Sequence, residues 1–140
     1  MDSSLRAFFE PKGVAIIGAS TKPNKLSYGI LENLVKCGYQ GGIYPVNPKG
    51  GEILGVPVYI NVASVPDPVD LAIIVLPVEM TLTTLQECAD RGIKNAVIIT
   101  SGFKEVGGAG AALESQVLSF AREHGMRIIG PNCVGVMNMN

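Results

Sequence analysis

The sequence predicts an α/β fold of three layers, in which helices cover both faces of a mainly parallel, five-stranded sheet. Short apolar runs alternate with segments of helical periodicity along the 140 residues, as in chains built from strand–helix–strand units. The runs are continuously apolar rather than alternating, which is typical of parallel strands buried on both faces. At this length we expect a single domain covering 1–140.

The predicted strands are the apolar runs at 13–19, 41–46, 70–77, 95–100 and 126–130. The predicted helices are the periodic segments at 25–37, 79–91 and 109–124, each followed by a glycine that ends it. The apolar stripe of the first helix is expected to consist of Leu26, Ile30, Leu31, Leu34 and Val35.

Two further segments lack a regular pattern. The segment 51–69 is too rich in proline and glycine for a full helix, so we expect an irregular crossover with a short turn near 61–65. The N-terminal stretch Ser3–Phe9 is expected to form a short helix capped by Ser3 or Ser4.

Composition excludes several classes of function. The net charge of -1 provides no global basic field that would recruit nucleic acid or a membrane surface. Three scattered cysteines without a C-x-x-C pair indicate free thiols in a reducing cytoplasm. One histidine and no cluster of ligands argue against zinc. No signal peptide and no apolar stretch of about 20 residues is found.

Ligands of open parallel sheets bind beyond the carboxyl ends of the strands, which selects five loops. In the first loop, "GASTKPNK", Gly18 allows a sharp turn, Ser20 offers a hydroxyl and an amide, and Lys22 and Lys25 offer charge. The helix that begins near Asn24 points its positive end at the same place. The loop is thus a candidate anion site, although it lacks two glycines of G-x-G-x-x-G. An ordinary strand-to-helix turn is the alternative.

The second loop, "NPKGG", lacks the carboxylate that NAD-binding folds place at the end of the second strand. Asn47 and Lys49 stand there instead. A lysine at this position favours a ligand with a phosphate on its ribose, which is true of NADP and of coenzyme A. A solvated turn lysine is the alternative.

The other three loops contribute further candidates. The third, "LPVE", contains Pro77, and the fourth, a glycine-rich loop, contains Ser101 and Gly102, which either contact a ligand or belong to a simple connection. The fifth places Asn132 beside Cys133, a thiol with no histidine near it in sequence. His124 ends a helix and is expected to interact with the helix dipole rather than to catalyse.

The five loops and their strands resemble the CoA-binding domain of the acyl-CoA synthetases that form a nucleoside diphosphate, the acetate–CoA ligase (ADP-forming) family. They are more distantly similar to the α subunit of succinyl-CoA synthetase. The segments that carry the resemblance, from Phe9 to about Asn138, are "VAIIGAS", "YPVNPKGGEILGVPVY", "VDLAIIVLP", "VIITSGFKE" and "GMRIIGPNCVGVMN".

The resemblance implies a Rossmann-like domain that binds CoA. By position, Gly18, Ser20 and Lys22 would surround the phosphates, Lys49 would match the family's lysine, and Asn132 would lie near the thiol. Ser101 and Gly102 would lie near the pantetheine arm. The family's phosphoryl-carrying histidine and its ATP-grasp portion lie in other domains, so the chain is expected to be the first domain of a longer synthetase and inactive by itself.

Two other readings stay open at this point. One is a stand-alone or acetyltransferase-linked CoA-sensing module, and the other is an NADP-dependent domain. An oligomer is compatible with the sequence.

Overall fold

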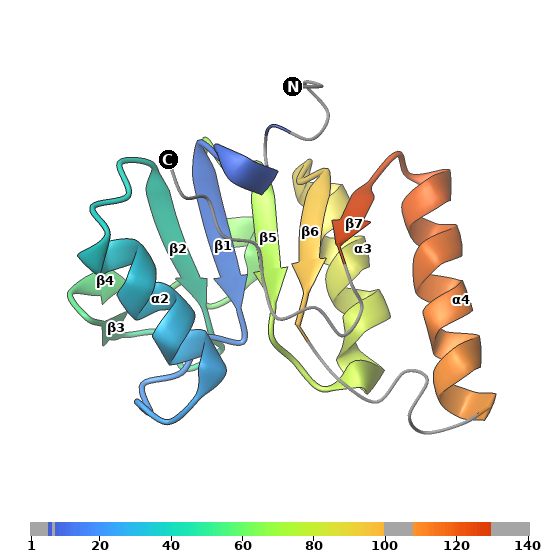
Figure 1. Cartoon of the computed structure of the whole chain (residues 1–140), viewed down its shortest axis with the longest axis horizontal. Coiled ribbons are helices and arrows are strands. Elements are labelled where there is room, and N and C mark those ends of the chain that lie inside the picture. The colour runs from blue at the N-terminus through green and yellow to red at the C-terminus, as the bar shows by residue number, and fades with distance from the viewer. Residues whose placement is uncertain (1–5, 7, 100–107, 130–140) are drawn as a thin grey trace.

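The computed structural model describes residues 6, 8–99 and 108–129, and it contains the predicted sheet. The five parallel strands are β1 (Gly13–Ile17), β2 (Gly42–Val46), β5 (Leu71–Ile74), β6 (Asn95–Ile98) and β7 (Arg127–Ile129). Their order in the sheet is β2-β1-β5-β6-β7 (Figure 1). The strands are shorter than the apolar runs, and the runs at 13–19 and 70–77 continue past the ends of β1 and β5 into the loops that follow.

Helices cover both faces of the sheet, which confirms the predicted three layers. The helices are α2 (Leu26–Lys36), α3 (Thr81–Arg91) and α4 (Gly108–Glu123), with 3-10 turns η1 (Val62–Ser64) and η2 (Val78–Met80). Leu31 of α2 packs in one cluster with Val14 and Ile16 of β1. Leu85 of α3 and Val117 of α4 pack with the opposite face of the sheet.

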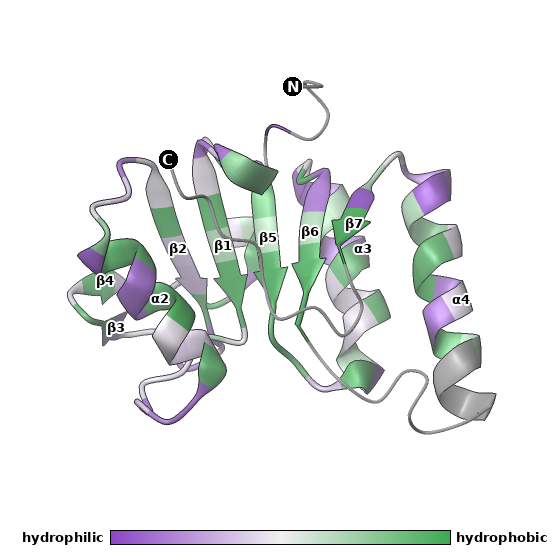
Figure 2. Cartoon of the chain, in the orientation of Figure 1, coloured by the Kyte–Doolittle hydropathy of each residue, from purple (hydrophilic) through white to green (hydrophobic). Residues whose placement is uncertain are grey.

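The core follows the hydropathy of the strands. Figure 2 shows β1, β5 and β6 as apolar over most of their length, and all five residues of β1 are buried. In α2 the predicted stripe is wrong at both ends, because Leu26 is 53% exposed and Val35 is 41% exposed, whereas Leu31 is fully buried. Leu26 is the first residue of α2, and it lies at a cleft described below.

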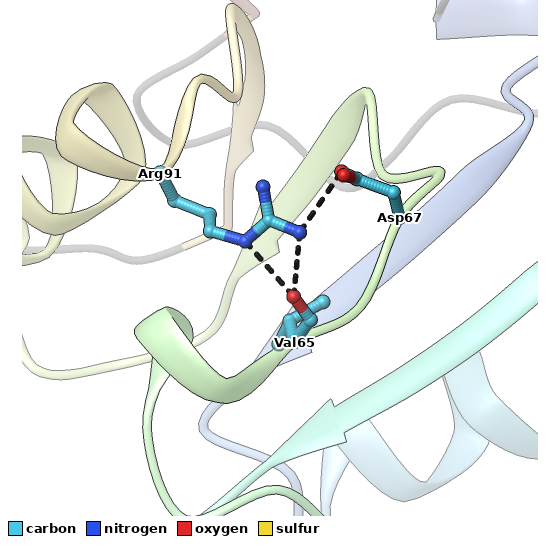
Figure 3. A network of polar contacts seen from close by, with 3 residues as sticks. All are labelled: Val65, Asp67 and Arg91. Atoms are coloured by element: carbon cyan, nitrogen blue, oxygen red, sulfur yellow. Dashed lines mark hydrogen bonds and ion pairs between the residues drawn. The ribbon is translucent and has the colours of Figure 1, made fainter.

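The crossover from β2 to β5 contains a small hairpin that the sequence did not predict. Strands β3 (Glu52–Ile53) and β4 (Val56–Pro57) pair antiparallel, and η1 follows within the predicted turn region. Two residues per strand are too few to produce a periodic pattern, which explains the omission. The crossover is also tied to α3, since the guanidinium of Arg91 donates to the carbonyl of Val65 (2.6 and 2.9 Å) and to Asp67 (2.9 Å; Figure 3).

Of the predicted N-terminal helix, the described residues Arg6, Phe8 and Phe9 are helical. The amide of Glu10 donates to the carbonyl of Arg6, while the predicted caps Ser3 and Ser4 lie outside the described residues. No helix in the described part of the chain is long and apolar enough to cross a membrane.

Candidate functional site

A cleft of about 910 Å³ lies at the carboxyl ends of β1, β2 and β5. It is the point at which the order of the strands reverses, because β1 leads to β2 on one side and the chain returns to β5 on the other side. Open α/β sheets bind their ligands at such a point. Its floor is formed by the strand ends Ile17, Val46 and Val75.

Gly18 opens the first wall of the cleft, and its backbone requires glycine. Its φ is +97°, and a Cβ added there would lie 2.1 Å from the carbonyl oxygen of Val75. The amides of Gly18 and Ala19 both donate to the carbonyl of Val46, at 3.1 Å each. The loop after β1 is therefore held close to its two neighbouring strands.

Asn47 joins the loop after β1 to the loop after β2. Its Nδ2 donates to the carbonyl of Ala19 at 2.8 Å, and its Oδ1 accepts from the amide of Lys49 at 2.8 Å. Its own amide donates to Tyr59 at 2.9 Å. Asn47 lines the cleft, and its side chain braces two loops at once.

Three lysines of these loops line the cleft: Lys22, Lys25 and Lys49. All three are exposed, and none forms an ion pair with another described residue. The Ser20 hydroxyl accepts from the amide of Lys22 at 3.1 Å, which fixes the turn that carries Lys22. Unpaired ammonium groups held on braced loops are suited to binding phosphate.

Helix α2 begins at the same wall. Lys25 is its N-cap, no side chain caps it, and its first turn contains no acidic residue. Lys25, Leu26 and Ser27 line the cleft. The partial positive charge of the helix end therefore adds to that of the lysines.

The opposite wall comes from η2 and α3. Leu76, Glu79, Met80, Thr83 and Glu87 line it. Pro77, a predicted site residue, is exposed and lies outside the cleft lining; its carbonyl accepts from the amide of Met80 at 3.0 Å and so starts η2.

Exposed apolar side chains gather at the cleft. Leu26, Ile60 and Met80 are 53%, 60% and 49% exposed, and all three line it. Sequence reasoning missed Ile60 and Met80. The position of Ile60 depends on the pairing of Tyr59 with the end of β2, where the amide of Tyr59 donates to Pro45 at 2.8 Å, and no periodic signal announces that contact.

The remaining residues singled out from the sequence are Ser101, Gly102, Asn132, Cys133 and His124. Ser101, Gly102, Asn132 and Cys133 lie outside the described residues. His124 follows α4 and precedes β7, at the amino end of the sheet. Its Nδ1 lies 2.9 Å from the carbonyl of Phe120, and its ring stacks on that of Phe120, which confirms the expected position at a helix end. No group of three His, Cys, Asp or Glu side chains in the described ranges could hold a metal ion.

Comparison with known proteins identifies the family. The family model described as CoA binding domain matches residues 12–139. Subunit alpha of the ADP-forming acetate–CoA ligase I of Pyrococcus furiosus is 50% identical over 138 residues, which is 96% of this chain and 30% of that protein. The ADP-forming acetate–CoA ligase of Methanocaldococcus jannaschii is 47% identical over 98% of this chain and 19% of its own length.

Solved structures agree with these relatives. A dinucleotide-forming acetyl-coenzyme A synthetase of Ca. Korarchaeum cryptofilum, in complex with phosphate and ADP, superposes with a TM-score of 0.86 at 43% identity. The match covers 91% of this chain and 27% of that one. The chain thus spans less than a third of the length of these relatives. With its Rossmann-like sheet and its cleft lined by three exposed lysines, the chain belongs to the CoA-binding domain family, whose ligand is coenzyme A.

Proposed function

We propose that the cleft binds coenzyme A and that this chain is the CoA-binding part of an ADP-forming acyl-CoA synthetase. The observation that carries the proposal is the presence, in one cleft, of three exposed lysines together with three exposed apolar side chains. Coenzyme A carries three phosphates at its nucleotide end, and it has an uncharged adenine ring with apolar faces and a largely uncharged pantetheine arm. The phosphates therefore match the lysines, and the uncharged parts of the ligand match the apolar side chains.

The phosphates would lie against the first wall. Lys22, Lys25 and the backbone beyond Gly18 would hold the pyrophosphate at the start of α2, with the Ser20 turn keeping Lys22 in place. Lys49, at the end of β2, would take the 3′-phosphate of the ribose. Charge-assisted contacts of this kind are about twice as strong as neutral hydrogen bonds.

The uncharged parts would lie on the apolar side chains. Leu26, Ile60 and Met80 expose carbon to solvent in the absence of ligand, and covering them removes apolar surface from water at about 25 cal/mol per Å². By the resemblance, Ser101 and Gly102 would accompany the pantetheine arm and Asn132 would lie near the thiol.

The loop after β2 disfavours a nicotinamide dinucleotide. No carboxylate stands between Val46 and Gly50 to accept from a ribose 2′-hydroxyl. Glu52 belongs to β3, and it is not among the residues that line the cleft.

In such a synthetase, CoA would be presented so that its thiol attacks an acyl phosphate. The resemblance assigns the histidine that carries the phosphoryl group, and the ATP-grasp portion that binds nucleotide, to further domains or subunits. The chain would then be the first domain of a longer protein of the cytoplasm. The curated relatives, both acetate–CoA ligases, favour this role over that of a CoA-sensing module.

Calorimetry with CoA, NADP and NAD on the same preparation tests the proposal. CoA is expected to bind in a 1:1 complex and more tightly than either dinucleotide. Tighter binding of NAD than of CoA would contradict the proposed ligand.

A further inference from the structure

Helices α2 and α3 lie on opposite faces of the sheet (Figure 1), and residues at the start of both line the cleft. Lys25 and Leu26 at the start of α2 line one wall, and Met80 and Thr83 at the start of α3 line the other. The first turn of any helix leaves amides without intrahelical partners and carries a partial positive charge. By backbone alone, both ends would attract a phosphate.

Side-chain charge separates the two ends. The α2 end has Lys22 and Lys25 beside it and no acid in its first turn. Glu79 lies in η2, directly before α3, and Glu87 lies further along the same wall. All the lysines and arginines among the described lining residues lie in the loops after β1 and β2.

The two carboxylates are not structural ion pairs. Glu79 and Glu87 are exposed, and neither forms a hydrogen bond or ion pair through its side chain with another described residue. Thr84, which also lines this wall, has its hydroxyl engaged with the carbonyl of Met80 at 2.8 Å. Among the described residues, the wall at α3 therefore presents negative charge without a cation paired to it.

We propose that Glu79 and Glu87 are specificity-determining residues that exclude phosphate groups from the α3 end of the cleft. Their repulsion leaves the α2 end as the place where the phosphates of the ligand bind, and so fixes which way round the ligand lies. The inference rests on the proposed binding of CoA. It adds repulsion by the two carboxylates to the attraction that the lysines exert on the phosphates.

Inorganic pyrophosphate, followed by amide chemical shifts of the isotope-labelled chain, tests the exclusion directly. In the wild type, pyrophosphate is expected to shift amides of 19–27 and to leave those of 79–84 unchanged. In Glu79→Gln/Glu87→Gln, the amides of 79–84 are expected to respond as well. Affinity should rise about two- to fivefold for each carboxylate removed, since exposed charge pairs interact weakly. This gain should disappear near 1 M salt, where the Debye length is about 3 Å.

Glu52→Gln is the matched control, because it removes one exposed carboxylate of β3 that does not line the cleft. It is expected to behave as the wild type. The inference is overturned if pyrophosphate shifts both ends equally in the wild type, if it shifts neither end in any variant, or if the double variant matches Glu52→Gln. Failure of the wild type to bind CoA in calorimetry would instead overturn the proposed function, since the pyrophosphate comparison does not involve CoA.

Discussion

The carboxamide of Asn47 donates to the carbonyl of Ala19 at 2.8 Å and thereby joins two loops that are 28 positions apart in the chain. Its oxygen accepts from the amide of Lys49 at the same time. One side chain thus sets the separation between the lysines after β1 and the lysine after β2.

Asn47→Asp tests this brace. A carboxylate keeps the acceptor for Lys49 but loses the donor to Ala19, and it faces the carbonyl oxygen instead. A lost hydrogen bond costs about 0.5–1.5 kcal/mol, so we expect the free energy of unfolding in urea to fall by about that amount. CoA affinity should fall about tenfold or more, because the new negative charge lies beside Lys49. Asn47→Ser with unchanged CoA affinity and stability would show that the brace is dispensable.

Lys49→Ala tests the assignment of the 3′-phosphate. A charge-assisted contact contributes about 1.5–3 kcal/mol, so CoA binding should weaken about ten- to a hundredfold, measured by calorimetry. Dephospho-CoA should bind the wild type and the variant almost equally. An equally large loss with dephospho-CoA would move Lys49 to the pyrophosphate. Lys36→Ala, an exposed lysine of α2 paired with Glu32, serves as the control.

Stability should fall in alkali through Cys88. Burial, with a smaller contribution from the charge of Glu87, raises the pKa of the Cys88 thiol from an ordinary value of 9.0 to about 12. The folded state therefore holds the proton more tightly than the unfolded state. The contribution of the protonated Cys88 thiol to the free energy of unfolding is fully present below pH 9. This contribution is lost progressively as the pH rises from about 9 to about 12.

Urea midpoints measured at pH 8 and at several values from about pH 9 to about pH 10.5 check this loss on the wild type and on Cys88→Ala. The variant should be less stable at pH 8 but should lose less stability with rising pH. Tyr39, whose pKa burial and the nearby Asp70 raise to about 12, adds a loss of the same sign above pH 10, common to both proteins. Parallel curves for the two proteins would contradict the prediction.

Thiol accessibility gives an independent prediction. Cys37 is exposed and Cys88 is buried. In a Cys133→Ser variant, a disulfide reagent should therefore modify Cys37 rapidly and Cys88 only in denaturant. Two rapidly reacting thiols in the folded chain would contradict the burial of Cys88.

The 140-residue chain is expected to bind CoA without catalysing thioester formation. Its histidine, His124, lies at the amino end of the sheet, whereas the cleft lies at the carboxyl ends. A strand length of roughly 15 Å separates these ends, and a phosphoryl carrier must approach within about 3.5 Å of its acceptor. Acetyl-CoA formation from acetate, CoA and ATP by the chain alone, abolished in His124→Ala, would contradict this placement.

The pattern of apolar residues and the residue types of the loops were sufficient to predict the sheet, the three helices and the two loops that carry the lysines. Continuous apolar runs predict buried parallel strands, and the spacing of Val117 and Ala121 predicts the buried face of α4, because both signals are local. The carboxyl-end rule then places Gly18, Lys22 and Lys49 at one edge of the sheet, since parallel strands end together.

Only the tertiary structure decided how the cleft is walled. Leu26 belongs to an apolar stripe by periodicity, yet it is exposed and lines the cleft instead of packing in the core. Ile60 reaches the cleft because its neighbour Tyr59 pairs with the end of β2. Glu79 lines the same cleft as the lysines because the crossover returns the chain to β5 beside β1. Contacts between segments that are far apart in the chain leave no periodic trace in the sequence. The presence of the lysines and of Glu79 in one cleft is therefore a consequence of the order of the strands in the sheet.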